Sequence, residues 1–415
     1  MHARSIPAAP PGPATAPEWE SARRAGARWL ADALRASRAD TLATFDAYRR
    51  VLPDLAVPMR AGLNPPLWEI GHVGWFQEYW IARNPALSDG SRADPDAPRR
   101  PAPRPDAEAL YHSSFVAHAS RWSLPLPGVD ETLDALAAQL ERTLALLARA
   151  GDDDDALYFF RLALLHEDMH HEAALYMAAA LGLPVHAPRS APEPLPEPPP
   201  QIVLDDGPWR LGEPGPGFAF DNELGPHDAP AGPASLDAQA VRWAEYLPFV
   251  AAGGYRDARL WSEAGLRWLR ESGADGPVAL RRDDDGGWSR RHGAGTRPLD
   301  VREAACHLNA HEAQAWCRWA GRRLPTEAEW ERAACTRPDA FRRGDAWEWT
   351  ASPFAPFPGF RPHPYRDYSA PWFDGRPVLR GGSWMTQPRI AHPRYRNFFH
   401  AHRTDVPAGL RSAAR

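Results

Sequence analysis

Lysine is absent from this 415-residue chain, and all 48 basic residues are arginine. No side chain can therefore form a lysine Schiff base or supply the lysine of a phosphate-binding P-loop. Cysteine is also scarce. The three cysteines, Cys306, Cys317 and Cys335, are too few and too widely spaced for a disulfide framework or a four-thiolate zinc site.

An excess of positive charge and long apolar runs are missing as well. The net charge is −5, so nothing indicates a polyanionic partner such as DNA or RNA. No run of about 18 apolar residues occurs, which argues against a membrane span. The first residues, MHARSIPAAPPGPATAPEW, contain no apolar core and do not form a secretory signal. We expect a soluble, cytoplasmic protein whose residues 1–18 form a disordered tail.

Proline is concentrated in one stretch, HAPRSAPEPLPEPPP, at residues 186–200. Proline at this density cannot continue a helix or a central strand, and it favours a semi-rigid extended linker. We therefore place a linker at 185–200, between a first domain at 19–184 and a second at 201–415.

The first domain has the sequence pattern of helices. One helix is marked by leucines at three- and four-residue steps and ends before Gly151; these are Leu133, Leu136, Leu140, Leu144 and Leu147. The acidic run Asp152–Asp155 suits the start of a further helix that continues to about Leu181. Segments 19–52 and 66–83 are also periodic. Four helices predict a bundle, in which metal sites are commonly built from facing helices.

The second domain has a different composition and pattern, with many tryptophans and glycines and with short segments. One clear helix is predicted at 311–320. A second is predicted at 326–334, where Thr326 and Glu329 have the spacing of a capping box. We expect short strands and long ordered loops in the remainder.

The stretch HEDMHHEAALYM, residues 166–177, contains the candidate metal ligands. His166 and His170 are four residues apart, so they project from one face of a helix, an arrangement that often binds metal. Glu172 lies about 200° around the helix from His170 and should not reach the same ion. We expect it to make a supporting or structural hydrogen bond. His171 should face a neighbouring helix or solvent.

Two other interpretations of this stretch remain open at this point. HEDMH satisfies the zinc-protease pattern H-E-x-x-H, with Glu167 as the base, although no third-ligand motif follows it. The stretch could also be a polar helix face without metal. His72, in NPPLWEIGHVGWFQEYW (64–80), is either a core histidine or a third ligand opposite His166 and His170. Three neutral imidazoles would leave coordination positions open for a substrate and dioxygen.

Several motifs in order along the chain resemble one enzyme family. The WEIGHVGWF segment and the H-x3-H-x-E helix resemble the DinB-like bundle of the ergothioneine sulfoxide synthases. Later segments resemble the formylglycine-generating-enzyme, or sulfatase-modifying-factor, fold: WCRWAGRRLPTEAEWERAA (316–334), WEWTASPFAPFPGF (347–360), YRDYS (365–369), VLRGGSW (378–384) and RYRNF (394–398). The resemblance covers about residues 20 to 412. It implies an α+β protein, a DinB-like four-helix bundle followed by a mixed domain of the formylglycine-generating-enzyme and C-type-lectin-like kind.

The resemblance also implies a chemistry. Enzymes of this family hold a non-haem Fe(II) with three histidines, which correspond to His72, His166 and His170. They use O2 to join a chalcogen to the imidazole of hercynine, which is trimethylated histidine. Tyr365 of the YRDY motif corresponds to a tyrosine near the iron that supplies a proton or an electron. The active site is then expected between the two domains.

The resemblance places the substrate pocket in the second domain. Asn397 and Phe398 match the segment that lines this pocket, and Tyr368 belongs to the same YRDY motif as Tyr365. The quaternary ammonium of hercynine cannot donate hydrogen bonds, so aromatic faces and carbonyl oxygens suit it.

Departures from the family pattern bear on the chalcogen donor. Phe399 stands where members that use γ-glutamylcysteine often have an aspartate, and Met169 replaces a common glutamine. Segment 110–128 keeps only Arg121 of an expected arginine pair, while Arg403 remains as an anion contact. This loss of charged groups is similar to the selenoneine synthase branch, which joins hercynine to a selenosugar and forms a selenoxide. We predict that reaction, with an ergothioneine sulfoxide synthase using γ-glutamylcysteine or cysteine as the alternative.

Activities of other classes are the remaining alternatives. A formylglycine-generating oxidase binds copper with a cysteine pair in its C-terminal region, but no cysteine follows Cys335 here. A zinc-dependent hydrolase would use HEDMH, and a non-catalytic module would bind hercynine without turnover. The predicted partners are small molecules only, namely hercynine, the donor and O2, with no nucleic acid and no membrane. The sequence predicts no oligomeric state.

Overall fold

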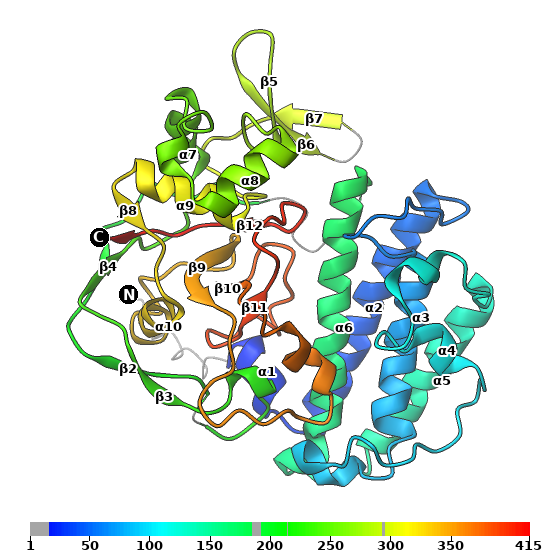
Figure 1. The fold of residues 1–415 in the computed structure, drawn as a ribbon. Coiled ribbons are helices and arrows are strands. Elements are labelled where there is room, and N and C mark those ends of the chain that lie inside the picture. Colours follow the sequence, from blue (N-terminus) through cyan, green and yellow to red (C-terminus); the bar gives the residue numbers. More distant parts are fainter. Residues whose placement is uncertain (1–15, 185–191, 214, 293–294) are drawn as a thin grey trace, which may run out of the picture.

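The computed structural model describes residues 16–184, 192–213, 215–292 and 295–415. In the first half, long helices form a bundle (Figure 1). The helices of this half are α1 (Glu18–Arg24), α2 (Ala27–Val51), α3 (Pro66–Gln77), α4 (Ala107–Tyr111), α5 (Val129–Leu147) and α6 (Asp154–Leu181). A π-helical turn, Glu78–Ala82, extends α3, and short 3-10 turns lie at Leu87–Arg92 and His118–Trp122. The four-helix bundle is therefore confirmed, with α2, α3, α5 and α6 as its members.

The ends of α6 follow from local sequence. The Asp153 side chain accepts a hydrogen bond from the Ala156 N–H at 2.9 Å, which caps the first turn. Gly182 ends the helix with a positive φ of 73°, a conformation that glycine adopts without steric cost. The expected helix at 19–52 is instead two helices, α1 and α2, separated at Ala25–Gly26. Residues 1–15 of the predicted tail lie outside the described residues, and Glu18 is already helical.

The second half contains small sheets rather than one large sheet. Two four-stranded sheets have the orders β1-β4-β13-β8 and β11-β10-β9-β12, and β2-β3 and β5-β6-β7 form smaller ones. The strands are β1 (Ile202–Leu204), β2 (Pro208–Leu211), β3 (His227–Pro230), β4 (Ala234–Leu236), β5 (Leu280–Arg282), β6 (Trp288–His292), β7 (Gly295–Pro298), β8 (Arg322–Arg323), β9 (Trp347–Pro353), β10 (Pro377–Arg380), β11 (Asn397–Phe398), β12 (Ala408–Gly409) and β13 (Ala413–Ala414). The predicted α+β fold class is confirmed.

Four helices accompany these sheets: α7 (Trp243–Ala251), α8 (Glu263–Ser272), α9 (Ala310–Trp319) and α10 (Glu327–Thr336). Both predicted helices are present, and α10 begins with the expected capping box between Thr326 and Glu329. The expectation of only strands and loops elsewhere was wrong for α7 and α8. The aromatic residues Trp243, Tyr246 and Phe249 bury one face of α7, and this burial stabilises a helix too short for a clear periodic signal.

The predicted linker is described only in part, because residues 185–191 lie outside the described residues. The rest of it packs on the second domain. Leu195 is buried beside Ala304 and Trp384, and its N–H donates to the Arg302 carbonyl at 2.9 Å. The domain boundaries remain predictions.

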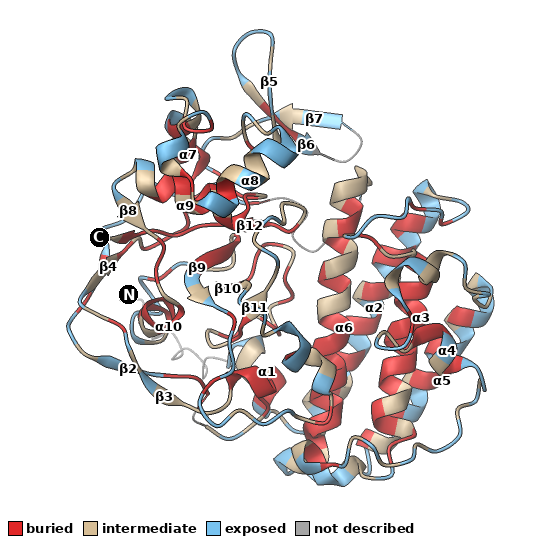
Figure 2. Cartoon of the chain, viewed as in Figure 1, coloured by how far each residue is buried: buried red, intermediate tan, exposed pale blue. Residues whose placement is uncertain are grey.

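Helix α6 lies beside the second domain (Figure 1). Figure 2 shows buried residues over α3, α6 and part of β9. Arg389 of the second domain binds both carboxylate oxygens of Asp168 on α6 at 2.8 Å, and Arg23 of α1 forms a similar pair with Glu223. Within the part of the chain that the structure describes, no helix is long and apolar enough to cross a bilayer.

Candidate metal centre

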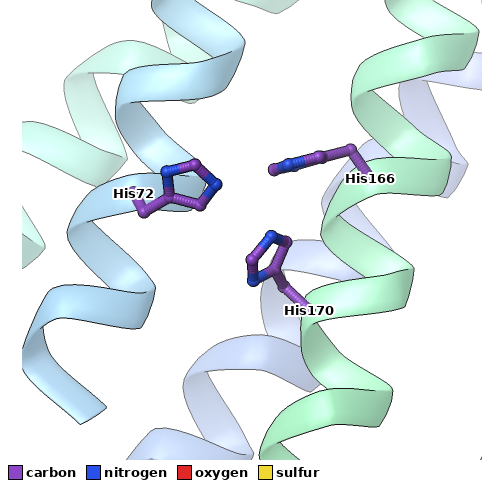
Figure 3. A group of neighbouring side chains, drawn as sticks. All are labelled: His72, His166 and His170. Carbon is purple, nitrogen blue, oxygen red and sulfur yellow. The ribbon is translucent and has the colours of Figure 1, made fainter. Parts of the chain in front are cut away.

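Three histidines converge between α3 and α6. His72 projects from α3 toward His166 and His170, which lie one turn apart on α6 (Figure 3). One nitrogen of each imidazole lies within 4.8 Å of the others, and His72 and His166 are buried. The structure therefore brings the three predicted ligands together from segments about 95 residues apart.

Hydrogen bonds orient the imidazoles. His72 donates from Nδ1 to the Tyr111 carbonyl at 2.8 Å, and His170 donates from Nδ1 to Glu69 Oε2 at 2.7 Å. Each bond fixes the tautomer and leaves the Nε2 lone pair available. Among the described residues, the buried Nε2 of His166 has no hydrogen-bond partner, which is costly unless a further group binds it.

The electrostatics also suit a metal. Burial and the neighbouring His170 lower the pKa of His72 to about 3, and burial lowers the pKa of His166 well below its usual value. Burial alone would raise the pKa of Glu69, but the adjacent His170 brings it below its ordinary value. Neutral imidazoles with a supporting carboxylate fit a divalent transition metal, whereas Mg²⁺ and Ca²⁺ prefer oxygen ligands.

Aromatic packing fixes the rings further. Phe76 stacks on His166 with ring centroids 3.5 Å apart, and Trp68 stacks on His72 at 4.9 Å. Gly71 allows Tyr111 to approach, because a Cβ at residue 71 would lie 2.3 Å from the Tyr111 ring. The WEIGHVGWF segment thus contains one of the three histidines and its stacking partners, and its Gly71 allows the close approach of the residue whose carbonyl orients that histidine.

A cavity of about 610 Å³ opens next to these histidines, between the two domains. Residues of both domains line it. The predicted site residues on its wall are His166, Met169, His170, Tyr365, Tyr368, Asn397, Phe398 and Phe399. The ring of Tyr365 lies 6.0 Å from that of His166, and burial raises the pKa of its phenol, so the phenol is protonated at neutral pH.

His72 does not line this cavity, and neither does Arg403, the one predicted substrate contact that the structure does not bring to the wall. Its guanidinium binds both carboxylate oxygens of Asp405, at 2.5 and 2.6 Å, and lies over the Phe399 ring. Met169 does line the cavity, but its sulfur also accepts a hydrogen bond from the Tyr395 hydroxyl at 3.3 Å. That hydroxyl in turn accepts one from Tyr368 at 3.0 Å.

Comparisons with known proteins agree with this architecture. Residues 33–180 match the DinB superfamily model, and residues 187–341 match the sulfatase-modifying factor enzyme 1-like domain. The chain is 32% identical over 407 residues to the hercynine oxygenase of Mycobacterium tuberculosis. The aligned region covers 85% of this chain and 91% of that protein. The chain belongs to the hercynine oxygenase family. The predicted family and the prediction of an oxidoreductase are thereby confirmed.

Other relatives support the same assignment. The hercynine oxygenase of Mycolicibacterium thermoresistibile is 31% identical, covering 85% of this chain and 87% of that protein. A formylglycine-generating enzyme of Streptomyces coelicolor is 32% identical over only 145 residues, 32% of this chain and 46% of that enzyme. The hercynine oxygenases are thus similar over both domains, and the formylglycine-generating enzyme over a part of the chain.

In this hercynine oxygenase family member, the other polar residues of α6 have structural contacts. Glu167 binds Arg38 at 2.7 Å and Gln77 at 3.1 Å in the bundle core, so it is not free to act as a protease base. Glu172 accepts hydrogen bonds from Trp347 and Thr386 of the second domain, both at 2.7 Å, as expected for a supporting role.

Two residues near the centre were missed as site residues in the sequence. Glu69 orients His170, and the signal was its position three residues before His72 on the same helix. Arg121 lines the cavity, stacks over Trp68 at 3.9 Å and donates to Asn64 at 2.9 Å, whereas the sequence indicates only that it lacks the second arginine of a pair. Asn64 donates to Glu69 at 2.5 Å, so Arg121 is linked to the metal centre.

Proposed function

We propose that the protein joins the imidazole of hercynine to the chalcogen of a small-molecule donor, with O2 as oxidant and Fe(II) held by His72, His166 and His170. The observation that carries this proposal is the convergence of three imidazoles beside the cavity between the domains, two of them on its wall, with a protonated tyrosine nearby. The names of the relatives supply hercynine and the oxygenase chemistry.

The proposed reaction balances. A C–H bond of the imidazole and the Se–H bond of the donor are lost, and a C–Se bond and an Se=O bond form. These changes remove four electrons from the substrates. One O2 accepts them, with one oxygen atom going to selenium and the other leaving as water.

The chain and the metal have separate tasks. Fe(II), when bound, supplies open coordination positions that favour the deprotonated chalcogen and the redox chemistry that O2 requires. Tyr365 holds a proton at its hydroxyl on the cavity wall close to His166, where it can be donated. The domains enclose the substrates on both sides, which holds the two reacting atoms in contact.

The cavity wall has groups that suit hercynine. Its carboxylate matches Arg121, the single arginine among the described residues that line the cavity. Its quaternary ammonium matches the aromatic faces of Tyr368 and Phe398, because a cation is attracted to the negative face of a ring.

The charged groups on the cavity wall also favour an uncharged donor. γ-Glutamylcysteine would bring two further carboxylates into a cavity whose wall has one arginine and also carries Asp367 and Glu172. Hydroxyl and amide groups of Ser113, Ser114 and Asn397 suit the hydroxyl groups of a sugar. We therefore favour the selenosugar over the thiol donors, and the product is then a selenoxide intermediate of selenoneine synthesis.

Turnover with different donors tests the proposal. The Fe(II)-loaded protein is given hercynine, O2 and either a selenosugar, γ-glutamylcysteine or cysteine. We expect kcat/KM at least about tenfold higher with the selenosugar, which corresponds to about 1.4 kcal/mol of transition-state binding. A preference for γ-glutamylcysteine would assign the protein to sulfoxide synthesis instead. In Arg121→Met, we expect a higher KM for hercynine with every donor.

A further inference from the structure

A second cavity lies inside the helical bundle and shares His170 with the large cavity. Its volume is about 30 Å³. Most of its wall is apolar, formed by Phe45 of α2, Ile70 and Val73 of α3, and Ala174 and Met177 of α6. All but Ala174 of these residues are buried, so this apolar part of the wall belongs to the bundle core.

Almost all the polar side chains on this wall already have a hydrogen-bond partner. Glu69 and His170 bind each other, both nitrogens of His171 are within 2.9 Å of partners on Thr44 and Gln387, and the Tyr48 hydroxyl donates to the Ala174 carbonyl. Among the described lining residues, the hydroxyl of Thr41 is the one side-chain group without a partner. A buried water needs two to four polar partners, so the wall favours an apolar guest over water.

We propose that this cavity is a binding site for dioxygen beside the metal centre. The inference rests on the proposed function, in which O2 is the one apolar substrate. A volume of about 30 Å³ exceeds the roughly 10–15 Å³ that one water-sized molecule requires, so a diatomic gas fits. Engineered cavities lined by aliphatic side chains stay dry and bind xenon for the same reason.

The position of the cavity gives it a role distinct from that of the large one. Hercynine and the donor are polar and fill the cavity between the domains. A gas site in the bundle, separated from that cavity by the His170 side chain, holds O2 close to the centre without competition from the polar substrates.

Filling the cavity tests its role in the reaction. Ala174→Leu adds three carbon atoms at the wall. We expect KM for O2 to rise at least threefold while KM for hercynine and the metal content stay unchanged. The matched control is Ala179→Leu, an equal enlargement on the same helix that lines neither cavity. This control should leave KM for O2 unchanged.

Xenon binding tests the site without any turnover. In xenon-pressurised crystals of the full chain, we expect a xenon atom beside Ile70 and Val73, its loss in Ala174→Leu, and higher occupancy in Ile70→Val, which enlarges the cavity by one methylene. No xenon in the unmodified protein would overturn the inference. An unchanged KM for O2 in an Ala174→Leu protein that has lost xenon would overturn it too. Xenon in a protein that consumes no O2 with hercynine would instead contradict the proposed function.

Discussion

At the metal centre, a hydrogen bond from His72 Nδ1 to the Tyr111 carbonyl and one from His170 Nδ1 to Glu69 orient two of the three imidazoles. His166 and His170 were predictable because their four-residue spacing defines one helix face. His72 was predicted only together with the family resemblance. Glu69 was not predicted, since a glutamate three residues before a histidine has several available partners until the packing of α3 against α6 is known.

Replacing Glu69 with glutamine should weaken metal binding. The amide cannot accept from both His170 and Asn64 as the carboxylate does, so His170 loses its fixed orientation or Asn64 loses its partner. We expect the dissociation constant for Fe(II) to rise by about 10- to 100-fold, measured anaerobically by competition with a chelator. Glu108→Gln, which removes the ion pair with Arg83 in the same domain, is the control. Equal affinities in all three proteins would contradict the assignment.

Among the elements, the long helices and the ten-residue helices α9 and α10 were predictable, whereas α7 and α8 were not. Helices α5 and α6 carry extended periodic patterns with polar or glycine ends, and both occur where expected. Helix α7 has nine residues with Pro248 inside, so its pattern is too short to distinguish from a strand. The pairing of β9 with β12 joins segments about 60 residues apart and depends on tertiary contacts that local sequence does not specify.

Helix α9 provides a pH-dependent test of the fold. Burial raises the pKa of Glu312, in the first turn of α9, from 4.5 to about 7. The folded protein thus binds this proton more tightly than the unfolded chain. The stabilisation is full below pH 4.5 and is lost as the pH rises through about 7, a change of about 3 kcal/mol.

Glu312→Gln removes this titration. We expect the free energy of unfolding of the unmodified protein to fall from pH 5 to pH 8 relative to that of the variant, as measured by urea denaturation. The loss of one hydrogen bond, from the Asn309 N–H or the Tyr255 hydroxyl, lowers the stability of the variant by an amount that does not vary with pH. Parallel pH profiles for the two proteins would show that Glu312 has an ordinary pKa in the folded state.

At the scale of the whole molecule, α6 joins the metal centre to the second domain. It carries two of the three converging histidines, while Asp168 and Glu172 of the same helix bind side chains of the second domain. The cavity depends on this interface because its wall comes from both sides. The sequence led us to expect a site between the domains. It did not predict the ion pair of Arg389 with Asp168, because many other carboxylates along the chain were equally available partners for Arg389.

Breaking the interface pair should destabilise the protein. Arg389→Met leaves the buried Asp168 without its cation, which typically costs about 3–5 kcal/mol. We expect a clear fall in the thermal unfolding midpoint. In the control, Arg259→Met, the arginine is solvent-exposed in its pair with Asp257, and such pairs contribute at most about 1 kcal/mol. Similar midpoints for the two variants would contradict a structural role for the interface pair.

The central claim is that His72, His166 and His170 hold the iron with which hercynine is oxidised. The most direct measurement is O2 consumption by the Fe(II)-loaded protein with hercynine and the selenosugar, compared between the unmodified chain, His170→Ala and His311→Ala. His311 lies on α9 and lines neither cavity. We predict one O2 consumed per product for the unmodified protein and His311→Ala, and none for His170→Ala. Full hercynine-dependent O2 consumption by His170→Ala would contradict the claim.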